Sequence, residues 1–137
     1  MTTEQTSAIA DHILGTGTLL DTARLRTKIA DVYGIGQPNL HAYVFGEHGD
    51  SSFVPWSLVN VASVPVDSYY DSLNGKGKAK PDHAEIEDFV RKSGGIIISA
   101  KKCTNYGIGA TTARLCEIIK NSNDSVTIAS SMLTGEY

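Results

Sequence analysis

The chain has 137 residues, 41% of them hydrophobic and 20% charged, and its formal net charge is −3. That length suits one domain that buries roughly 65–70% of its unfolded surface, and the composition is ordinary for a soluble globular protein. The acidic balance gives no basic field for nucleic acid or an anionic membrane surface. No apolar run reaches the roughly 18 residues that a bilayer requires. We therefore expect neither a nucleic-acid partner nor a membrane partner.

The amino-terminal residues and the cysteines bear on the compartment. Residues 1–11 are polar, lack the charged and apolar regions of a signal peptide, and form a lead-in without an assignment. Cys103 and Cys116 are 13 positions apart in what we predict to be one helix, which separates them by about 20 Å. A disulfide cannot bridge that distance. We therefore expect a cytoplasmic chain with reduced thiols.

The first predicted elements are a short strand and a helix. A brief strand over 12–18 ends in Gly-Thr-Gly-Thr. A helix follows over 19–34, because apolar residues recur at helical spacing and Gly34 provides a stop. Its apolar stripe consists of Leu25, Ile29, Val32 and Tyr33.

Two apolar segments come next. Residues 38–45 are rich in β-branched and aromatic side chains and predict a buried strand. Residues 52–66 are expected to return antiparallel to it, with an interruption at Pro55. The Gly, Lys and Asn content of residues 71–81 predicts a loop.

The rest of the chain is predicted to be mostly helical. Asp82 and Glu85 have the spacing of a capping box. A long helical region follows, bent or broken near Gly94–Gly95 and again over 104–109. A closing strand is predicted over 125–133. Together these elements indicate an α+β chain with antiparallel strands and long helices.

The stretch YVFGEHGDS, residues 43–51, places a histidine between carboxylates and glycines. Histidine suits proton transfer near neutral pH, and a neighbouring carboxylate, Asp50 or Glu47, could orient the ring of His48. An exposed polar turn is the alternative. A zinc site is disfavoured because no second His or Cys lies at ligand spacing, so we expect no metal.

The stretch DTARLR, residues 21–26, offers two arginines on one predicted helix. Helical geometry puts Asp21 and Arg24 about 60° apart, and Arg26 about 160° from Arg24. The two arginines therefore address different surroundings. The alternative is an intrahelical ion pair, worth a few tenths of a kcal/mol, beside a solvated arginine.

The glycine run at 15–18 is a weak signal for phosphate binding. It lacks the third glycine of G-x-G-x-x-G and the strand–helix unit that this motif requires. We therefore reject a dinucleotide-binding fold within the chain.

Three stretches in order, GTGTLLDTARLR, HAYVFGEHGDS and CTNYGIG, closely resemble the catalytic half of L-lactate dehydrogenase. The resemblance covers residues 12–137 and implies a partial substrate domain, the α+β C-terminal half of the lactate/malate dehydrogenase fold, with the Rossmann half absent. It implies NAD as cofactor, bound mainly by that other half. It also implies a small 2-oxo or 2-hydroxy acid as substrate, and a homo-oligomer, a tetramer in the family.

The resemblance also implies roles for individual residues. His48 would be the proton donor and acceptor, and Asp21, 27 positions earlier, would hydrogen-bond its ring. Arg24 would hold the substrate carboxylate through a two-pronged contact, for which lysine is poorer. Thr104 would line the substrate pocket, and Thr16 would approach the cofactor.

An effector site is implied as well. Bacterial family members activated by fructose 1,6-bisphosphate bind it through residues that correspond to Arg26 and His41. Both residue types are present here, so the chain resembles the activated type. A structural strand histidine is the alternative for His41.

The departures from the family leave three functions open. The amino-terminal half and the strands after GEY are absent, which suggests a fragment, a truncated product or a half that needs a partner, inactive when tested alone. A related malate-type L-2-hydroxy-acid dehydrogenase is one rival, although Glu47 in place of a second glycine favours lactate. The other rival is a non-catalytic remnant that binds sugar phosphate or other subunits.

Overall fold

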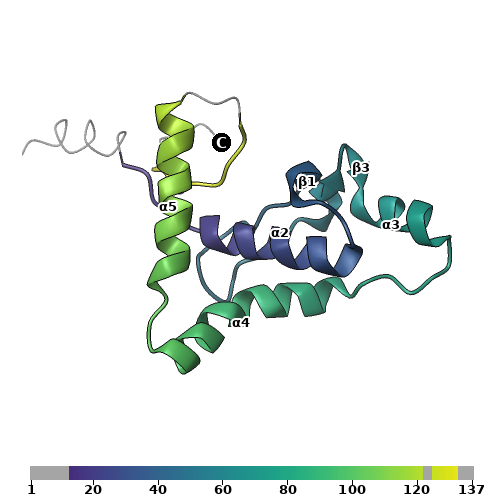
Figure 1. Cartoon of the computed structure of the whole chain (residues 1–137), viewed down its shortest axis with the longest axis horizontal. Helices are drawn as coiled ribbons and strands as arrows, with labels where there is room; N and C mark the ends of the chain where they lie inside the picture. The colour runs from purple at the N-terminus through teal and green to yellow at the C-terminus, as the bar shows by residue number, and fades with distance from the viewer. Residues whose placement is uncertain (1–12, 122–124, 133–137) are drawn as a thin grey trace, which may run out of the picture.

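The computed structural model describes residues 13–121 and 125–132 of the chain. Its elements are α2 (Leu19–Tyr33), η1 (Gln37–Asn39), β1 (Leu40–His41), η2 (Trp56–Leu58), β2 (Asn60–Val61), β3 (Val64–Pro65), α3 (Val66–Asn74), α4 (His83–Lys101) and α5 (Asn105–Lys120). Figure 1 shows α2 and α4 side by side and running in opposite directions. Helix α5 stands across one end of this pair, and the strands and α3 lie towards the other end. The predicted α+β class is confirmed.

Helix α2 begins and ends close to the predicted bounds. Gly34 adopts the left-handed conformation, with φ of 68°, and its N–H donates to the carbonyl of Ala30. That conformation favours glycine, which explains the stop. Leu25 and Ile29 are fully buried, as predicted, whereas Val32 at the edge of the stripe is 39% exposed.

The segment predicted as a strand over 38–45 is extended but only partly paired. Its buried apolar side chains alternate as expected for a strand: Leu40, Ala42 and Val44. Strand β1 nevertheless contains two residues, and the remaining pairing is an isolated antiparallel bridge between Phe45 and Phe53. The predicted strand is therefore too long.

Side chains of α2 explain why residues 42–44 need no neighbouring strand. Thr18 Oγ1 donates to the carbonyl of Val44 at 2.5 Å, and Val44 N–H donates to Thr22 Oγ1 at 3.0 Å. Arg26 Nε donates to the carbonyl of Ala42 at 3.0 Å. Buried backbone polar groups must be paired, and here a helix provides the partners. The extended segment is thereby fastened along α2.

The three short strands form one antiparallel sheet in the order β1-β2-β3. Leu40 pairs with Val61, and Val61 pairs with Val64 on its other side. The predicted antiparallel return is thus confirmed. The interruption at Pro55 is also confirmed, because η2 begins directly after this residue.

Helix α3 is absent from the predicted elements. It occupies the end of the segment predicted as a strand and the first four residues of the predicted loop 71–81. Its sequence, VDSYYDSLN, is rich in residues of low helix propensity. Position rather than propensity favours the helix: Pro65 precedes it, and Asp67 lies in its first turn. The buried Val66 anchors it to the core.

Helix α4 begins with the predicted cap. Asp82 Oδ1 accepts the N–H of Ala84 at 2.8 Å. The helix then continues through Gly94–Gly95 without a break, so the first predicted interruption is wrong. The buried side chains of Val90, one turn earlier, and Ser93, directly before Gly94, hold this part of α4 against the molecule. Packing thereby outweighs the low helix propensity of two glycines.

The interruption between α4 and α5 lies at residues 102–104. Lys102 ends α4 with a φ of 64°, and α5 passes through Gly107 and Gly109 without a break. Gly107 permits a close approach of α5 to α2, because a Cβ there would lie 3.3 Å from Leu20 Cδ1. Cys103 lies in this turn, Cys116 in α5, and both thiols are free and exposed. The expectation that one helix carries both cysteines is therefore wrong.

The two predicted terminal strands are reduced to a single contact. Within residues 13–18 and 125–132, Gly15 and Ser130 form an isolated antiparallel bridge, and no strand is formed. Gly17 has a φ of 45°, and a Cβ there would come within 2.3 Å of Ser130 Oγ, so the close approach requires glycine. The lead-in over 1–11 lies outside the described residues.

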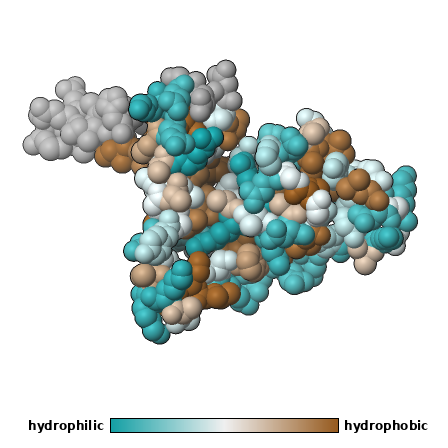
Figure 2. All heavy atoms as spheres, in the orientation of Figure 1, coloured by the Kyte–Doolittle hydropathy of each residue, from teal (hydrophilic) through white to brown (hydrophobic). Residues whose placement is uncertain are grey.

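One core joins these elements. Its members come from α2, the extended segment, the stretch over 54–61, α3 and α4: Leu25, Ile29, Tyr33, Leu40, Ala42, Val44, Val54, Val59, Val61, Val66, Ile86 and Val90. On the face seen in Figure 2, hydrophobic residues form several separate patches among hydrophilic ones. In the part of the chain that the structure describes, no helix is long and apolar enough to cross a membrane.

Candidate active site

One cleft of about 490 Å³ gathers five of the seven residues that the sequence singled out. It lies between the start of α2, the loop over 46–52, the middle of α4 and the start of α5. The five are Thr16, Asp21, Arg24, His48 and Thr104. Residues far apart in sequence therefore share one solvent-accessible site.

His48 is presented by a loop with its own hydrogen bonds. The Phe45–Phe53 bridge closes the loop, and Gly46 turns it with a φ of 89°. Inside the loop, Ser51 Oγ donates to a carboxylate oxygen of Glu47 at 2.8 Å. The side chain of His48 is 62% exposed and faces the cleft.

Asp21 joins the histidine to the arginine. Its Oδ2 lies 2.5 Å from His48 Nδ1, and its Oδ1 accepts Arg24 Nη1 at 3.0 Å. Because an ionised carboxylate only accepts hydrogen bonds, Nδ1 carries a proton. Nε2 is then the ring nitrogen that exchanges a proton with a ligand. The side chain of Asp21 is only 10% exposed, which holds this geometry away from water.

The sequence predicted that Asp50 or Glu47 orients the His48 ring, and this prediction is wrong. Glu47 pairs with Ser51 inside the loop. Asp50 lines the cleft and makes no hydrogen bond to the ring within the described residues. The carboxylate at the ring comes instead from α2, 27 positions before the histidine, as the family resemblance implies.

Arg24 keeps donors for a ligand. One N–H of Nη1 is used by Asp21, and the guanidinium makes no other hydrogen bond within 13–121 and 125–132. Its side chain is 16% exposed. A partly buried guanidinium with free N–H groups can bind a carboxylate through two parallel bonds.

Thr104 and Thr16 complete the cleft. Thr104 is the N-cap of α5, yet its hydroxyl makes no capping bond, which leaves it for the cleft. The carbonyl of Thr16 accepts the N–H of Leu19 at 2.8 Å in the turn before α2. Both residues therefore lie in turns that line the same cleft as the histidine.

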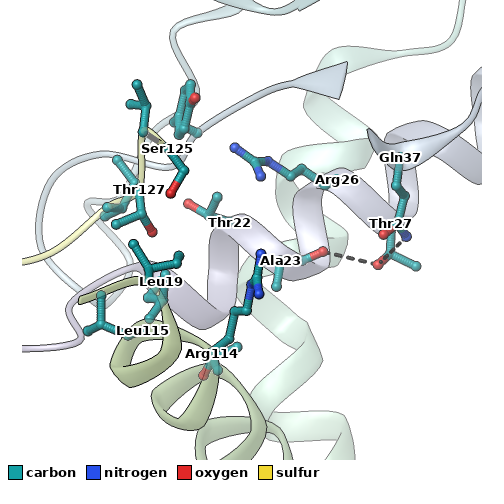
Figure 3. A pocket seen from close by; sticks show the side chains of 15 residues that line it. Leu19, Thr22, Ala23, Arg26, Thr27, Gln37, Arg114, Leu115, Ser125 and Thr127 are labelled. Atoms are coloured by element: carbon teal, nitrogen blue, oxygen red, sulfur yellow. Dashed lines mark hydrogen bonds between the residues drawn. The ribbon is translucent and has the colours of Figure 1, made fainter. Parts of the chain in front are cut away.

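Arg26 faces a separate pocket of about 330 Å³ on the other side of α2. Its guanidinium carbon lies 4.9 Å from the centre of the Tyr43 ring, and its Nε is bonded to Ala42. The alternative of a solvated arginine is therefore wrong. Figure 3 shows Arg26 from α2 and Arg114 from α5 directed towards this pocket. No acidic residue is among the described residues that line it.

His41 does not share that pocket. It is exposed on β1, next to the Ala42 carbonyl that accepts Arg26. Arg26 and His41 thus lie on neighbouring parts of the surface without a direct contact. A site that uses both residues would need a ligand or a second subunit between them.

Three residues that support the cleft were not singled out by any motif and were missed in the sequence: Thr18, Thr22 and Arg91. Thr18 and Thr22 fasten Val44 to α2, and so set how close the histidine loop comes to Asp21. Their spacing of four, one turn on the face beside Asp21, is the signal that could have revealed them. Arg91 of α4 also lines the cleft and has no such signal.

A second polar cluster lies outside the cleft. The Tyr33 hydroxyl donates to Asp67 Oδ1 at 3.1 Å and lies 3.1 Å from His83 Nε2. The His83 ring stacks on Trp56, with ring centres 3.7 Å apart. Burial, and then the nearby Asp67 carboxylate, raise the pKa of Tyr33 well above its usual range. The phenol stays protonated and ties the end of α2 to α3 and α4.

Comparison with known proteins identifies the family. The sequence model of the lactate/malate dehydrogenase α/β C-terminal domain matches residues 18–137. L-lactate dehydrogenase 2 of Clostridium acetobutylicum is 42% identical over 127 residues, which cover 93% of this chain and 39% of that protein. L-lactate dehydrogenase of Mycoplasma pneumoniae is 38% identical over 127 residues, with the same two coverages. The chain therefore spans about two fifths of the curated relatives that it matches.

Solved structures agree with the sequences. A lactate dehydrogenase from a Medee basin deep-sea metagenome library superimposes with a TM-score of 0.83 and 40% identity, covering 92% of this chain and 40% of that one. The minor L-lactate dehydrogenase of Enterococcus mundtii gives 0.80 and 36%, covering 93% and 40%. The match in sequence and in fold shows that this chain belongs to the lactate/malate dehydrogenase family, as its α/β C-terminal domain.

Proposed function

We propose that the chain is the substrate domain of an NAD-dependent L-lactate dehydrogenase that interconverts pyruvate and L-lactate in the cytoplasm. One observation carries the proposal: a single buried carboxylate, Asp21, contacts both the His48 imidazole and the Arg24 guanidinium in one cleft. A 2-oxo acid requires such a pair, because its carboxylate needs a fixed cation and its carbonyl oxygen needs a proton donor.

The residues of the chain divide the work between binding and proton transfer. Arg24 binds the substrate carboxylate through its free N–H groups. His48 then donates the Nε2 proton to the carbonyl oxygen as it becomes an alcohol, and in the reverse direction it removes the hydroxyl proton. Asp21 holds the ring with Nδ1 protonated and stabilises the imidazolium form. Thr104 contributes a hydroxyl to the wall of the cleft.

A nicotinamide cofactor supplies the hydride when bound. The cleft suits its reactive end, because His48 is exposed within it and Thr16 and Gly17 belong to the same lining. No G-x-G-x-x-G loop occurs in the sequence, so the pyrophosphate would be held elsewhere. Thr16 is the residue of this chain that we assign to the cofactor.

A monocarboxylate fits the cleft better than a dicarboxylate such as oxaloacetate. A second substrate carboxylate would need a second available cation. The other guanidinium in the cleft, that of Arg91, is paired with Glu87 at 2.6 Å and bonded to the carbonyl of Ser52. Three of its five N–H groups are therefore already used by the protein, and Glu87 offsets its charge. This favours lactate over the malate-type alternative.

The pocket around Arg26 supports a second proposal, an anionic effector site. Arg26, Arg114 and several hydroxyl side chains line it without an acidic residue, a combination suited to phosphate groups. Arg114 also pairs with Glu117 at 3.0 Å, so Arg26 is the arginine of the pocket without an acidic partner among the described residues. We assign fructose 1,6-bisphosphate to it by family resemblance. His41 would join from a neighbouring subunit, because one arginine and one histidine neutralise a bisphosphate poorly and a two-fold interface doubles them. This requires a homo-oligomer, a tetramer by resemblance.

A chimera tests the catalytic proposal. The aligned segment of this chain would replace its counterpart in L-lactate dehydrogenase 2 of Clostridium acetobutylicum, and NADH oxidation would be followed with pyruvate and with oxaloacetate. We expect turnover with pyruvate. His48→Ala should lower kcat by at least about 10²–10⁴-fold, the typical contribution of general acid–base catalysis. Near-normal turnover of that variant would refute the role of His48, and preference for oxaloacetate would refute the substrate.

The effector proposal has its own assay. Calorimetric titration of the assembled chimera with fructose 1,6-bisphosphate is compared with that of an Arg26→Gln, His41→Gln double variant. Binding should be lost in the variant. Equal affinity in both proteins would exclude these residues as the site and would favour a different or absent effector.

A further inference from the structure

Arg91 makes an unusual contact from the middle of α4 to the end of the histidine loop. Its Nε and Nη2 both donate to the carbonyl of Ser52, at 3.3 and 3.0 Å. Ser52 is 6% exposed and is the last loop residue before the Phe45–Phe53 bridge. A buried carbonyl without a partner is costly, so Arg91 provides a bond that the loop end requires.

A second contact fixes the guanidinium itself. Arg91 Nη2 donates to Glu87 Oε2 at 2.6 Å, one helical turn earlier on α4. The other oxygen, Glu87 Oε1, accepts the indole N–H of Trp56 at 2.7 Å. The Glu87–Arg91 pair thus holds the chain at the last residue of the histidine loop, Ser52, and at Trp56 beyond it. The side chains of Glu87 and Arg91 are largely shielded, at 19% and 32% exposed.

The histidine loop therefore has two different anchors. Its entrance is fastened to α2, where Thr18 and Thr22 hold Val44. Its exit is fastened to α4 through Arg91. The His48 side chain between them is 62% exposed and depends on the loop for its position. Freeing the exit would weaken the hold on the ring, because only the Phe45–Phe53 bridge and the bonds inside the loop would then support the contact with Asp21 from this side.

We propose that Arg91, oriented by Glu87, is a positioning residue that keeps His48 against Asp21 by fixing the exit of the loop over 46–52. Arg91 lines the cleft, but three of its five N–H groups donate to the protein, and we assign its effect on the reaction to the loop. Its part in catalysis rests on the proposed function, whereas its part in holding the loop does not. The two parts can be tested separately.

Nuclear magnetic resonance of the full chain tests the loop directly. In the ¹⁵N-labelled protein, the Nδ1 proton of His48 should give a low-field resonance that disappears in Asp21→Asn. In Arg91→Gln we expect this resonance to broaden or vanish. Amide hydrogen exchange should accelerate at least about ten-fold over residues 51–53, as expected for a lost hydrogen bond to a charged donor. Glu87→Gln should affect the same residues less.

Lys92→Gln is the matched control. Lys92 forms an ion pair with Asp88 at the same spacing on the same helix, but its side chain is 66% exposed. Lys92→Gln should leave the His48 resonance and the amide hydrogen exchange of the loop unchanged. Wild-type behaviour of Arg91→Gln would overturn the proposal. Equal loss of protection over α2, α4 and α5 would also overturn it, because Arg91 would then stabilise the whole fold rather than the loop.

A kinetic measurement on the chimera addresses the catalytic part. Arg91→Gln should lower kcat about ten-fold or more with a smaller change in KM, because misplacing the proton donor affects the transition state more than substrate binding. Arg91→Lys, which keeps the charge but loses the forked donor geometry, should recover part of kcat. If kcat is unchanged while the loop is loosened, the catalytic role fails. An inactive wild-type chimera would count against the proposed function instead.

Discussion

Arg24 and Arg26 are two residues apart on one helix, yet they lie in opposite kinds of surroundings. Arg24 is paired with one buried carboxylate and keeps free donors that face the cleft. Arg26 is bonded to a backbone carbonyl, stacked on Tyr43 and directed into a pocket without acidic residues. Two residues along a helix correspond to a separation of about 160° around its axis. The two arginine side chains therefore point to opposite sides of α2 and serve different purposes.

The first way to sharpen this comparison is to remove the guanidinium of Arg24. Arg24→Gln in the chimera should lower kcat/KM for pyruvate by roughly 10²–10⁴-fold, since two hydrogen bonds to a charged carboxylate contribute about 1.5–3 kcal/mol each. The kcat/KM of Arg24→Lys should lie between those of Arg24→Gln and the wild type, because lysine keeps the charge and loses the two-pronged geometry. Steady-state kinetics measure both. An Arg24→Gln enzyme within a few-fold of wild type would show that the carboxylate binds elsewhere.

The same change at Arg26 should act mainly on stability. Arg26→Gln leaves the Ala42 carbonyl without its partner and removes the stacking on Tyr43. We expect the free energy of unfolding to fall by about 1–3 kcal/mol, the cost of an unsatisfied buried acceptor. Urea denaturation measures it. Lys92→Gln, which removes an exposed ion pair, should cost at most about 0.5 kcal/mol, and equal losses in the two variants would contradict the structural role of Arg26.

The contrast between the arginines could be predicted from sequence because it needs only helical geometry. The capping of α4 by Asp82 and the stop of α2 at Gly34 are equally local. The ends of the strands could not be predicted, because whether residues 42–44 pair with a strand depends on threonine side chains 22 and 26 positions earlier. Helix α3 and the uninterrupted passage through Gly94–Gly95 depend on burial against distant elements.

The cleft shows the same limit. His48 stood out in its motif. Its neighbours in the sequence, Glu47 and Asp50, were predicted as partners of the ring, and neither is its partner. Asp21 is the partner because Thr18 and Thr22 bring the strand before the loop against α2. Family resemblance supplied that pairing, whereas local sequence could not. Arg91 was missed because its role depends on a carbonyl, and a carbonyl has no sequence signature.

The buried end of α2 offers a test that involves neither arginine. The pKa of Tyr33 is raised in the folded state, first by burial and then by Asp67. The protonated phenol therefore contributes stability that is fully present below its unfolded pKa and is lost as the pH rises above it. Above about pH 10, wild type should lose about 1.4 kcal/mol per pH unit relative to Tyr33→Phe. Urea denaturation between pH 8 and about 11 measures both proteins. Parallel curves would show that Tyr33 ionises equally in both states.

The smallest effect is expected for a substitution at Gly95, in the wall of the cleft that contains Arg24. Gly95 lies inside α4 on the cleft, and a Cβ there would meet no atom within 4 Å. Gly95→Ala should raise the free energy of unfolding by about 0.5–1 kcal/mol, because alanine has the higher helix propensity and limits the unfolded chain. The melting temperature should rise by roughly 2–6 °C.

Gly107→Ala provides the control for that substitution. Gly107 is also helical, but its Cβ would lie 3.3 Å from Leu20 Cδ1, where α5 packs on α2. Leu20 must shift to admit the methyl group, which opposes the gain in helix propensity. Gly107→Ala should therefore be less stable than Gly95→Ala. If Gly95→Ala also destabilises the protein, the space beside Gly95 is occupied by the protein in solution, and the cleft that contains Arg24 is narrower than described.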